Sequence, residues 1–235
     1  MMFQIVIIAG GIGSRLGKLT QKTPKALIKI NKKPFIYYQL NQLSKQGFKK
    51  VLICVGYLGN KIKKYVGNGE KFNLNIKYSH ESKKLLGTAG CIRKAVSSLE
   101  DNFFVIYGDA YLPVNFKDIQ RDFTKQKAKA LITVYKNNNK FDSSNAYFKG
   151  KNIFYKKNSR NTKMNFIDYG VSVFSKDIFT DSKLKTLSDL SDLFTILSKK
   201  KKLKHHVVKK RFYEIGSNAG LKETKNYLKY SIQKL

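Results

Sequence analysis

Four short apolar segments, separated by helix-like stretches, limit most strongly how the first half of this chain can fold. They are FQIVIIA, KVLICVG, LNIKYS and FFVIYGD, at residues 3–9, 50–56, 74–79 and 103–109. Strands that are apolar along most of their length need cover on both faces, which is typical of parallel sheets. The pattern therefore predicts an open, doubly wound α/β sheet.

The stretches between these strands carry helix signals. Pro34 suits the first position of a helix that Gly47 would end. Residues 88–99 form a second helix candidate, for which Thr88 is the expected N-cap. Strand and helix thus alternate through the first half, as parallel pairing requires.

The second half has a different pattern. ALITVYK, NAYFKG, NIFYKK and FIDYGVSVF are strand-like, and the remaining helix candidates are residues 187–199 and 219–232. This order favours a small, partly antiparallel layer added to the first sheet. Because no Pro- or Ser-rich linker separates the halves, we expect one domain over residues 1–235.

Composition narrows the class of protein. A chain of 235 residues that is 42% hydrophobic can bury a substantial core. No apolar run approaches the length of a membrane span and no signal-like segment opens the chain, so we expect a cytoplasmic protein without membrane insertion. Cys54 and Cys91 lack metal-binding spacing and stand in apolar contexts, which predicts buried, reduced thiols.

The net charge of +32 raises the alternative of a nucleic-acid-binding module. Only five of the 47 basic residues are arginine, however, and the lysines are scattered along the whole chain. Base and phosphate recognition favours the planar fork of arginine. We therefore expect a solvated lysine-rich surface that attracts anionic substrates, and no nucleic-acid partner.

The loop after the first strand, AGGIGSRLGKLTQKTPK at residues 9–25, is rich in glycine and cations. It does not fit a dinucleotide fingerprint, because Leu16 stands where the third glycine is needed. It does not fit a Walker A loop either, because Ile12 and Leu19 occupy required Gly and Ser/Thr positions. An ordinary turn with surface lysines is the third interpretation.

The remaining pattern suits a phosphate. Glycines at positions 10, 11 and 13 let backbone N–H groups approach phosphate oxygens closely. Arg15 can fork onto those oxygens, and Lys25 adds a point charge after Pro24, which restricts the backbone just before it. The loop is thus predicted to hold a polyphosphate.

Four segments spread over nearly the whole chain resemble one family. GGIGSRLGKLTQKTPKALIKINKKPFI is similar to the signature GGxGTRLxPLTxxxPKPLxxxxxKP of sugar-1-phosphate nucleotidyltransferases, with Ser14 in place of Thr. LLGTAG, YGDAYL and YEIGSNAGL resemble the nucleobase loop, the metal-binding GD motif and the late DIGTPE segment of that family. The segments YGDAYLP, SNAYF and IDYGVSVF resemble those of the heptose-1-phosphate guanylyltransferase branch of this family.

The resemblance implies a Rossmann-like mixed sheet with a nucleotide-binding half at residues 1–112 and an antiparallel sugar-binding half at 113–235. It implies an enzyme that joins an NTP to a sugar 1-phosphate and releases pyrophosphate. Catalysis would fall to Arg15, Lys25 and Asp109, with Mg²⁺ held by Asp109 and by Glu214, where the family usually carries Asp. The implied nucleotide-binding residues are Ala9, Gly10, Gly11, Gly13, Ser14, Arg15, Lys25, Glu81, Gly87, Thr88 and Gly108.

By the same resemblance, the sugar-binding residues are Asn145, Lys157, Asp168 and Gly170, with Lys156 standing where the family often has Glu. A carboxylate at Glu81 could accept from the N1–H and N2–H₂ groups of guanine, which favours GTP. A cytidylyl- or uridylyltransferase acting on another sugar phosphate or on phosphocholine stays open, as does a non-catalytic nucleotide-binding subunit. The partners expected are an NTP and a sugar 1-phosphate, and a homodimer is an open alternative.

Overall fold

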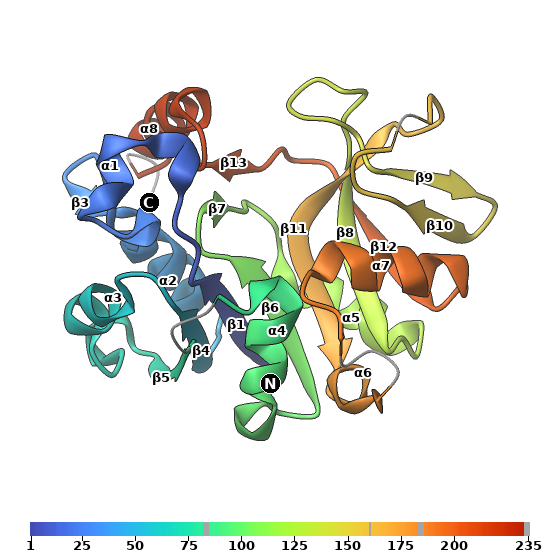
Figure 1. Ribbon diagram of the computed structural model, residues 1–235, viewed down its shortest axis with the longest axis horizontal. Helices are drawn as coiled ribbons and strands as arrows, with labels where there is room; N and C mark the ends of the chain where they lie inside the picture. The colour runs from blue at the N-terminus through green and yellow to red at the C-terminus, as the bar shows by residue number, and fades with distance from the viewer. Residues whose placement is uncertain (82–84, 160, 183–185, 233–235) are drawn as a thin grey trace.

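The computed structural model describes residues 1–81, 85–159, 161–182 and 186–232 (Figure 1). Its centre is a nine-stranded mixed sheet whose main path runs β10-β9-β11-β6-β1-β4-β5, with β8 pairing with β11 and β12. The first-half strands β1 (Gln4–Ala9), β4 (Lys50–Val55), β5 (Asn75–His80) and β6 (Asn102–Tyr107) run parallel to one another. The predicted doubly wound sheet is confirmed.

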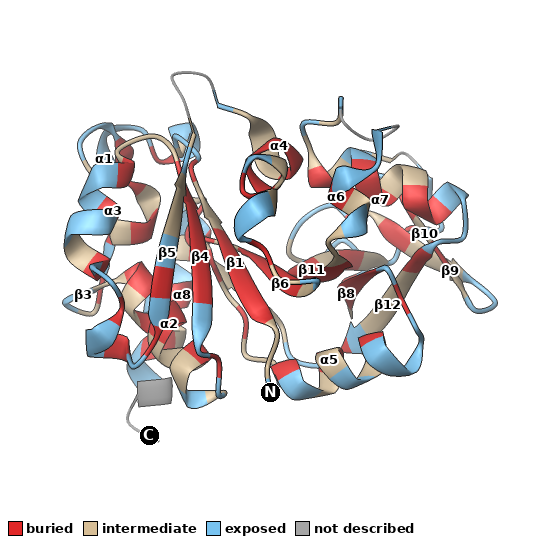
Figure 2. Cartoon of the chain, turned by 90° about the horizontal axis from the view of Figure 1, so that it is seen from below, coloured by how far each residue is buried: buried red, intermediate tan, exposed pale blue. Residues whose placement is uncertain are grey.

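Helices cover both faces of this sheet, which is why its strands could be apolar along their length (Figure 2). Ile5 and Ile7 of β1 pack into one cluster together with side chains of α2 (Phe35–Lys45), α3 (Gly59–Val66) and α5 (Phe116–Lys125). Val6 points to the other face and joins a cluster that includes α4 (Gly87–Lys94), α6 (Asp177–Thr180) and α7 (Leu190–Lys199).

The strands of the second half extend the same sheet. β11 (Phe166–Ser175) pairs antiparallel with both β6 and β8 (Ala130–Lys136), and β8 pairs in parallel with β12 (Leu203–Val208). The hairpin of β9 (Ala146–Lys149) and β10 (Asn152–Tyr155) joins the end of β11. The expected antiparallel part is therefore present. It is joined to the parallel strands by the pairing of β11 with β6.

The chain then returns to the first half (Figure 1). β13 (Tyr213–Glu214) pairs with β7 (Ala110–Tyr111), and α8 (Asn218–Ile232) packs near the hairpin of β2 (Lys29–Ile30) and β3 (Lys33–Pro34). The short remaining elements are α1 (Lys18–Gln21) and 3-10 turns at Ser14–Leu16, Lys25–Leu27, Glu70–Phe72 and Val96–Ser98. This return places the late segment of the sequence beside the glycine-rich loop.

Two local predictions have different outcomes. Cys54 and Cys91 are buried free thiols, as expected. The prediction of Thr88 as an N-cap is wrong: α4 begins one residue earlier, at Gly87, and the Thr88 hydroxyl bonds to Asp189 on a distant segment. None of the helices in the described ranges combines the length and the apolar composition that crossing a bilayer requires.

Candidate active site

A cavity of about 220 Å³ opens at the carboxyl ends of β1 and β6. This is the edge at which open α/β sheets bind their ligands. Nine of the predicted site residues line it, namely Ala9, Gly10, Gly11, Lys25, Glu81, Gly87, Thr88, Gly108 and Asp109. The structure also adds Tyr107 and Asp189 to the lining. Sequence segments up to 180 residues apart therefore meet in one place.

Glycines let a carboxylate enter the wall of this cavity. A methyl group built on Gly10 would lie 2.8 Å from Glu81 Oε2, and one built on Gly56 would lie 2.5 Å from the same atom. The pKa of the Glu81 carboxyl is raised chiefly by burial, while the N–H of Leu86 and the charge of Lys94 act in the opposite sense. Glu81 is thus held as an acceptor against two bare backbone segments.

The glycine-rich loop presents unused backbone donors. Among the described residues, no acceptor is found for the amide N–H groups of residues 11–14. Gly13 has a φ of +74°, in the left-handed region, and a methyl group there would lie 3.0 Å from both Thr20 Cγ2 and Lys25 Cε. The Thr20 hydroxyl lies 3.0 Å from the Gly13 carbonyl oxygen and 3.2 Å from that of Gly17, which closes the loop on itself.

The charged groups converge beside this loop. Lys25 Nζ donates to Asp109 Oδ2 at 2.8 Å, and the two side chains are 18% and 28% exposed. A methyl group built on Gly216 would lie 2.7 Å from Glu214 Oε2, 3.0 Å from Arg15 Nη2 and 3.3 Å from Asp109 Oδ2. Two carboxylates and a guanidinium therefore surround one backbone position.

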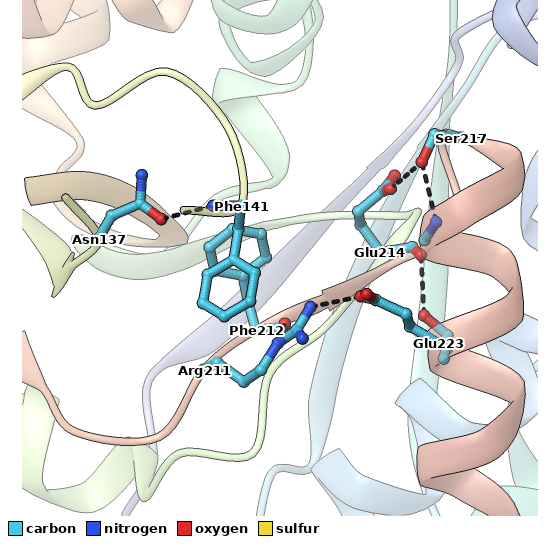
Figure 3. Close-up of polar contacts among 9 residues, drawn as sticks. Asn137, Phe141, Arg211, Phe212, Glu214, Ser217 and Glu223 are labelled. Carbon is cyan, nitrogen blue, oxygen red and sulfur yellow. Dashed lines mark hydrogen bonds and ion pairs between the residues drawn. The ribbon is translucent and has the colours of Figure 1, made fainter. Parts of the chain in front are cut away.

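Strand pairing and a helix end position Glu214 (Figure 3). The N–H of Ile215 donates to the Asp109 carbonyl oxygen at 2.9 Å, which ties the two acidic segments together. The Glu214 carboxylate accepts from the Gly216 N–H and the Ser217 hydroxyl at the start of α8, and the Glu214 carbonyl accepts from the Thr224 hydroxyl at 2.8 Å. The helix dipole favours a negative charge at this end.

Arg211 braces the same segment (Figure 3). Its guanidinium carbon lies 3.9 Å from the Phe141 ring centre and 4.7 Å from that of Tyr213, and it donates to Glu223 on α8 at 2.7 Å. The loop after β8, the returning chain and α8 are thereby joined just before Glu214.

Three of the four predicted sugar-binding residues lie close together near Tyr107, namely Asn145, Asp168 and Gly170. Asn145 Oδ1 accepts from the Asp168 N–H at 2.8 Å, and Asp168 Oδ1 accepts from the Gly170 N–H at 3.0 Å. Gly170 has a φ of +98°, and a methyl group on it would meet the Tyr107 ring at 3.5 Å. Burial raises the pKa of the Asp168 carboxyl to about 6. Lys157 is exposed just beyond β10.

Comparison with known proteins identifies the family of the chain. The family model described as nucleotidyl transferase matches residues 4–229. The chain belongs to the nucleotidyl transferase family. A D-glycero-alpha-D-manno-heptose 1-phosphate guanylyltransferase of Campylobacter jejuni is 29% identical over 91% of this chain and 94% of that protein. An N-acetylmuramate alpha-1-phosphate uridylyltransferase of Neisseria meningitidis is 37% identical over 47% of this chain and 48% of its own length.

Solved structures show the same nucleotidyl transferase fold. A putative glucose-1-phosphate thymidylyltransferase from Bacillus anthracis, in complex with a sucrose, superposes with a TM-score of 0.83 at 21% identity, covering 95% of this chain and 94% of that one. HddC from Yersinia pseudotuberculosis, complexed with GMP-PN, gives 0.81 at 24% identity, covering 97% of this chain and 100% of that one.

Sequence reasoning missed Tyr107 in the lining, and it missed three further residues of this candidate site. Gly56 follows an apolar strand in the same way as Gly10 does, and Gly216 lies inside the YEIGSNAGL segment. Gly56 and Gly216 could therefore have been found from the sequence. Asp189 carried no such signal, because its partner Thr88 is 101 residues away in the chain. Only folding brings these two together.

Proposed function

We propose that the protein transfers the nucleotidyl group of an NTP, GTP by preference, to a heptose 1-phosphate, giving an NDP-sugar and pyrophosphate. The observation that carries the proposal is that the glycine-rich loop and the Lys25–Asp109 pair line one cavity, while Arg15 and Glu214 lie outside its lining, beside Asp109 at Gly216. A polyphosphate is the substrate that such a set of donors and charges would hold.

The reaction would need positioning and charge neutralisation more than proton transfer. An oxygen of the sugar phosphate attacks the α-phosphorus, a new P–O bond forms, and the bond to the β-phosphate breaks, so that its electron pair leaves on pyrophosphate. The attacking oxygen is already ionised, so no general base is required. Among the described residues that line the cavity, none is histidine.

The glycine-rich loop and the cations Arg15 and Lys25 would bind the phosphates of the NTP. The free N–H groups of residues 11–14 would donate to the triphosphate. Arg15 would neutralise the leaving pyrophosphate, and Lys25 would meet the α-phosphate. Lys25 and Asp109 both line the cavity, and their ion pair would hold the Lys25 ammonium group in place before substrate arrives.

The carboxylates fit a magnesium ion. Asp109 and Glu214 both present oxygens beside Gly216, and hard oxygen ligands from one or two carboxylates are what Mg²⁺ uses at phosphate-transfer sites. No group of three or more His, Cys, Asp or Glu side chains forms a metal site within the described ranges, so phosphate oxygens and water would complete the shell. The ion would neutralise charge on the phosphate oxygens.

Two findings support the choice of base and sugar. Glu81 is an acceptor in the wall of the cavity, where it could pair with guanine N1–H and N2–H₂. The Campylobacter relative is a heptose 1-phosphate guanylyltransferase, and HddC was solved with GMP-PN. A uridylyltransferase is the second candidate, because the Neisseria relative carries that activity in its name.

Pyrophosphate release tests the proposal directly. Purified protein is incubated with GTP, UTP, CTP, ATP or dTTP and with heptose, hexose or N-acetylhexosamine 1-phosphate, with Mg²⁺ or with EDTA. We expect turnover with GTP and heptose 1-phosphate that EDTA abolishes. Turnover with UTP alone would favour the second candidate, and no turnover with any pair would overturn the enzyme assignment.

Asp109→Asn gives the matched mechanistic test. We expect it to reduce kcat by about 100-fold or more, since a charge that acts on the reacting phosphates is lost. Asp118→Asn removes the same charge from a partly exposed position on α5 outside the cavity, where Asp118 pairs with Arg121, and should leave kcat unchanged. Circular dichroism should show both variants folded.

A further inference from the structure

A hydrogen bond between Thr88 and Asp189 joins the two halves of the chain in the wall of the cavity. The Thr88 hydroxyl donates to Asp189 Oδ1 at 2.9 Å and accepts from the Leu190 N–H at 2.8 Å. A hydroxyl has one hydrogen to donate, so that of Thr88 is committed to Asp189. Thr88 lines the cavity, yet its hydrogen is directed to a neighbouring side chain and away from any ligand.

Backbone contacts fix the same junction. The Ser188 carbonyl oxygen accepts from the N–H groups of Ala89 at 2.7 Å and Gly90 at 3.2 Å, at the first turn of α4. A methyl group on Gly87 would lie 2.5 Å from that carbonyl oxygen, so only glycine permits the approach. Asp189 is therefore held at a set position relative to Gly87 and the first turn of α4.

The Asp189 carboxylate faces the cavity with spare capacity. Asp189 is half-buried, lines the cavity, and makes no side-chain cap for its own helix α7. Oδ1 is held by Thr88, and the described residues provide no partner for Oδ2. An ionised carboxylate accepts up to about four hydrogen bonds, so most of its acceptor sites are unused.

The negative charge of Asp189 also acts on Tyr155, a residue that the charge of Asp168 affects as well. Burial raises the pKa of Tyr155 on β10, and the negative charges of Asp168, Asp189 and Asp192, in decreasing order, add to this effect. Asp189 thus lines the same cavity as Glu81, and its charge acts on a tyrosine that the charge of Asp168 also affects. A carboxylate there would repel phosphates, and the neutral donors that a nucleotide and a sugar phosphate both carry are ring hydroxyls.

We propose that Asp189 is a substrate-binding residue that accepts a hydrogen bond from a sugar-ring hydroxyl, and that Thr88 is a positioning residue that orients it. The proposal rests on the proposed transfer reaction. The hydroxyl belongs either to the ribose of the NTP or to the ring of the sugar 1-phosphate, and both present the same chemistry to a carboxylate.

The test compares Asp189→Ala and Asp189→Asn with Asp192→Asn. Asp192 is an exposed acid on the same helix that does not line the cavity, so its variant controls for charge. We expect the two Asp189 variants to raise the KM of one substrate about tenfold or more, because a hydrogen bond to a charged group is lost. The Asn variant keeps the side-chain volume and an oxygen for Thr88, which guards against a folding defect.

Deoxy-nucleotides separate the two sources of the hydroxyl. If ribose is the donor, 2′- or 3′-deoxy-GTP should bind the wild type more weakly than GTP, and this preference should vanish in Asp189→Ala. If the sugar phosphate is the donor, its own KM should rise while the nucleotide preference is unchanged. Either outcome supports the proposal, and values within about twofold of Asp192→Asn for both substrates would overturn it.

Thr88 provides a second, independent readout. Thr88→Val keeps the shape and removes the hydroxyl, so it should raise the same KM as the Asp189 variants, and Thr88→Ser should restore it. Equal KM values for Val and Ser would contradict the positioning role. Calorimetric titration of each protein with GTP, deoxy-GTP and heptose 1-phosphate gives the same comparison without turnover. A wild type that binds but does not turn over would therefore count against the proposed function while still testing Asp189.

Discussion

Single glycines determine how closely the charged groups of this protein can approach one another. At Gly10 and Gly56 the missing side chain leaves room for the Glu81 carboxylate, and at Gly216 it leaves room for Arg15, Asp109 and Glu214. None of these three glycines needs a positive φ. Their requirement comes from close approach of neighbouring groups. At Gly216 all three neighbouring atoms belong to side chains, so substitution there should affect the site more than the backbone.

Gly216→Ala tests this at the position where most charge converges. We expect kcat to fall by about 100-fold, because the new methyl group displaces the two carboxylates and the guanidinium, and misplacement by about 1 Å has a large effect on positioned reactions. The Tm should change little. Gly150→Ala is the matched control: Gly150 has a φ of +60° and open space around it, so the Tm should fall and kcat should stay the same. The opposite pattern would contradict the assignment.

Asp168 links a single carboxyl to the stability of the whole chain. Burial raises its pKa from the ordinary 3.8 to about 6 in the folded protein. Between these values the folded state binds more protons than the unfolded state, so the free energy of unfolding falls as the pH rises. Above about pH 6 the cost of the buried charge is fully present.

Asp168→Asn should remove this dependence. The amide oxygen can still accept from the Gly170 N–H, and no charge is buried at any pH. Relative to the variant, the wild type should lose between about 1 and 3 kcal/mol of unfolding free energy between pH 3.5 and pH 7. Urea titrations at several pH values measure this, and two parallel stability profiles would show that Asp168 is not the cause.

At the scale of elements, the return of the chain through β13 into α8 completes the site. Glu214 reaches Asp109 only because β13 pairs with β7 and because the first turn of α8 holds the Glu214 carboxylate. Arg211 ties this return to the loop after β8 through Phe141, and to α8 through Glu223. The position of Glu214 therefore depends on three elements at once.

A double-mutant cycle of Arg211→Lys and Phe141→Leu measures this brace. Lysine keeps the charge but loses the planar stacking, so we expect a coupling free energy of about 1 kcal/mol between the two positions. Urea unfolding of the two single variants and the double variant gives the value. Additive effects would mean that the ring and the guanidinium do not stabilise each other.

At the scale of the whole molecule, one sheet unites the two halves. β11 pairs with β6 of the first half and with β8 of the second, so the backbone hydrogen bonds of the sheet continue from one half into the other. Core side chains follow the same arrangement, since one buried cluster contains both Val6 and Val134. We infer that the chain unfolds as one unit.

Native-state hydrogen exchange checks this inference. We expect amides of β4 and β8, which lie in different halves, to exchange with the same free energy of opening. Val134→Ala, which truncates a side chain with 0% exposure in β8, should lower protection in β4 by the same amount, about 1–3 kcal/mol. Loss of protection in β8 alone would show two independent units.

The sequence by itself determined the elements and most of the residues around the cavity. Apolar runs and glycine positions predicted the parallel strands and the phosphate loop, because burial on both faces and close backbone approach impose local patterns on the chain. Resemblance to a family then supplied Glu81, Asp109, Glu214 and the residues expected around the sugar, and the structure brings most of them together.

Only the tertiary structure decided which partners these residues have. Thr88 was expected to cap its own helix, and it bonds instead to Asp189 from the far half of the chain. The Glu214 carboxylate lies on the first turn of α8, and Gly56 and Gly216 matter because of what approaches them in space. A contact across a hundred residues depends on how the sheet is ordered and how helices pack on it, and that information is not present in any local pattern.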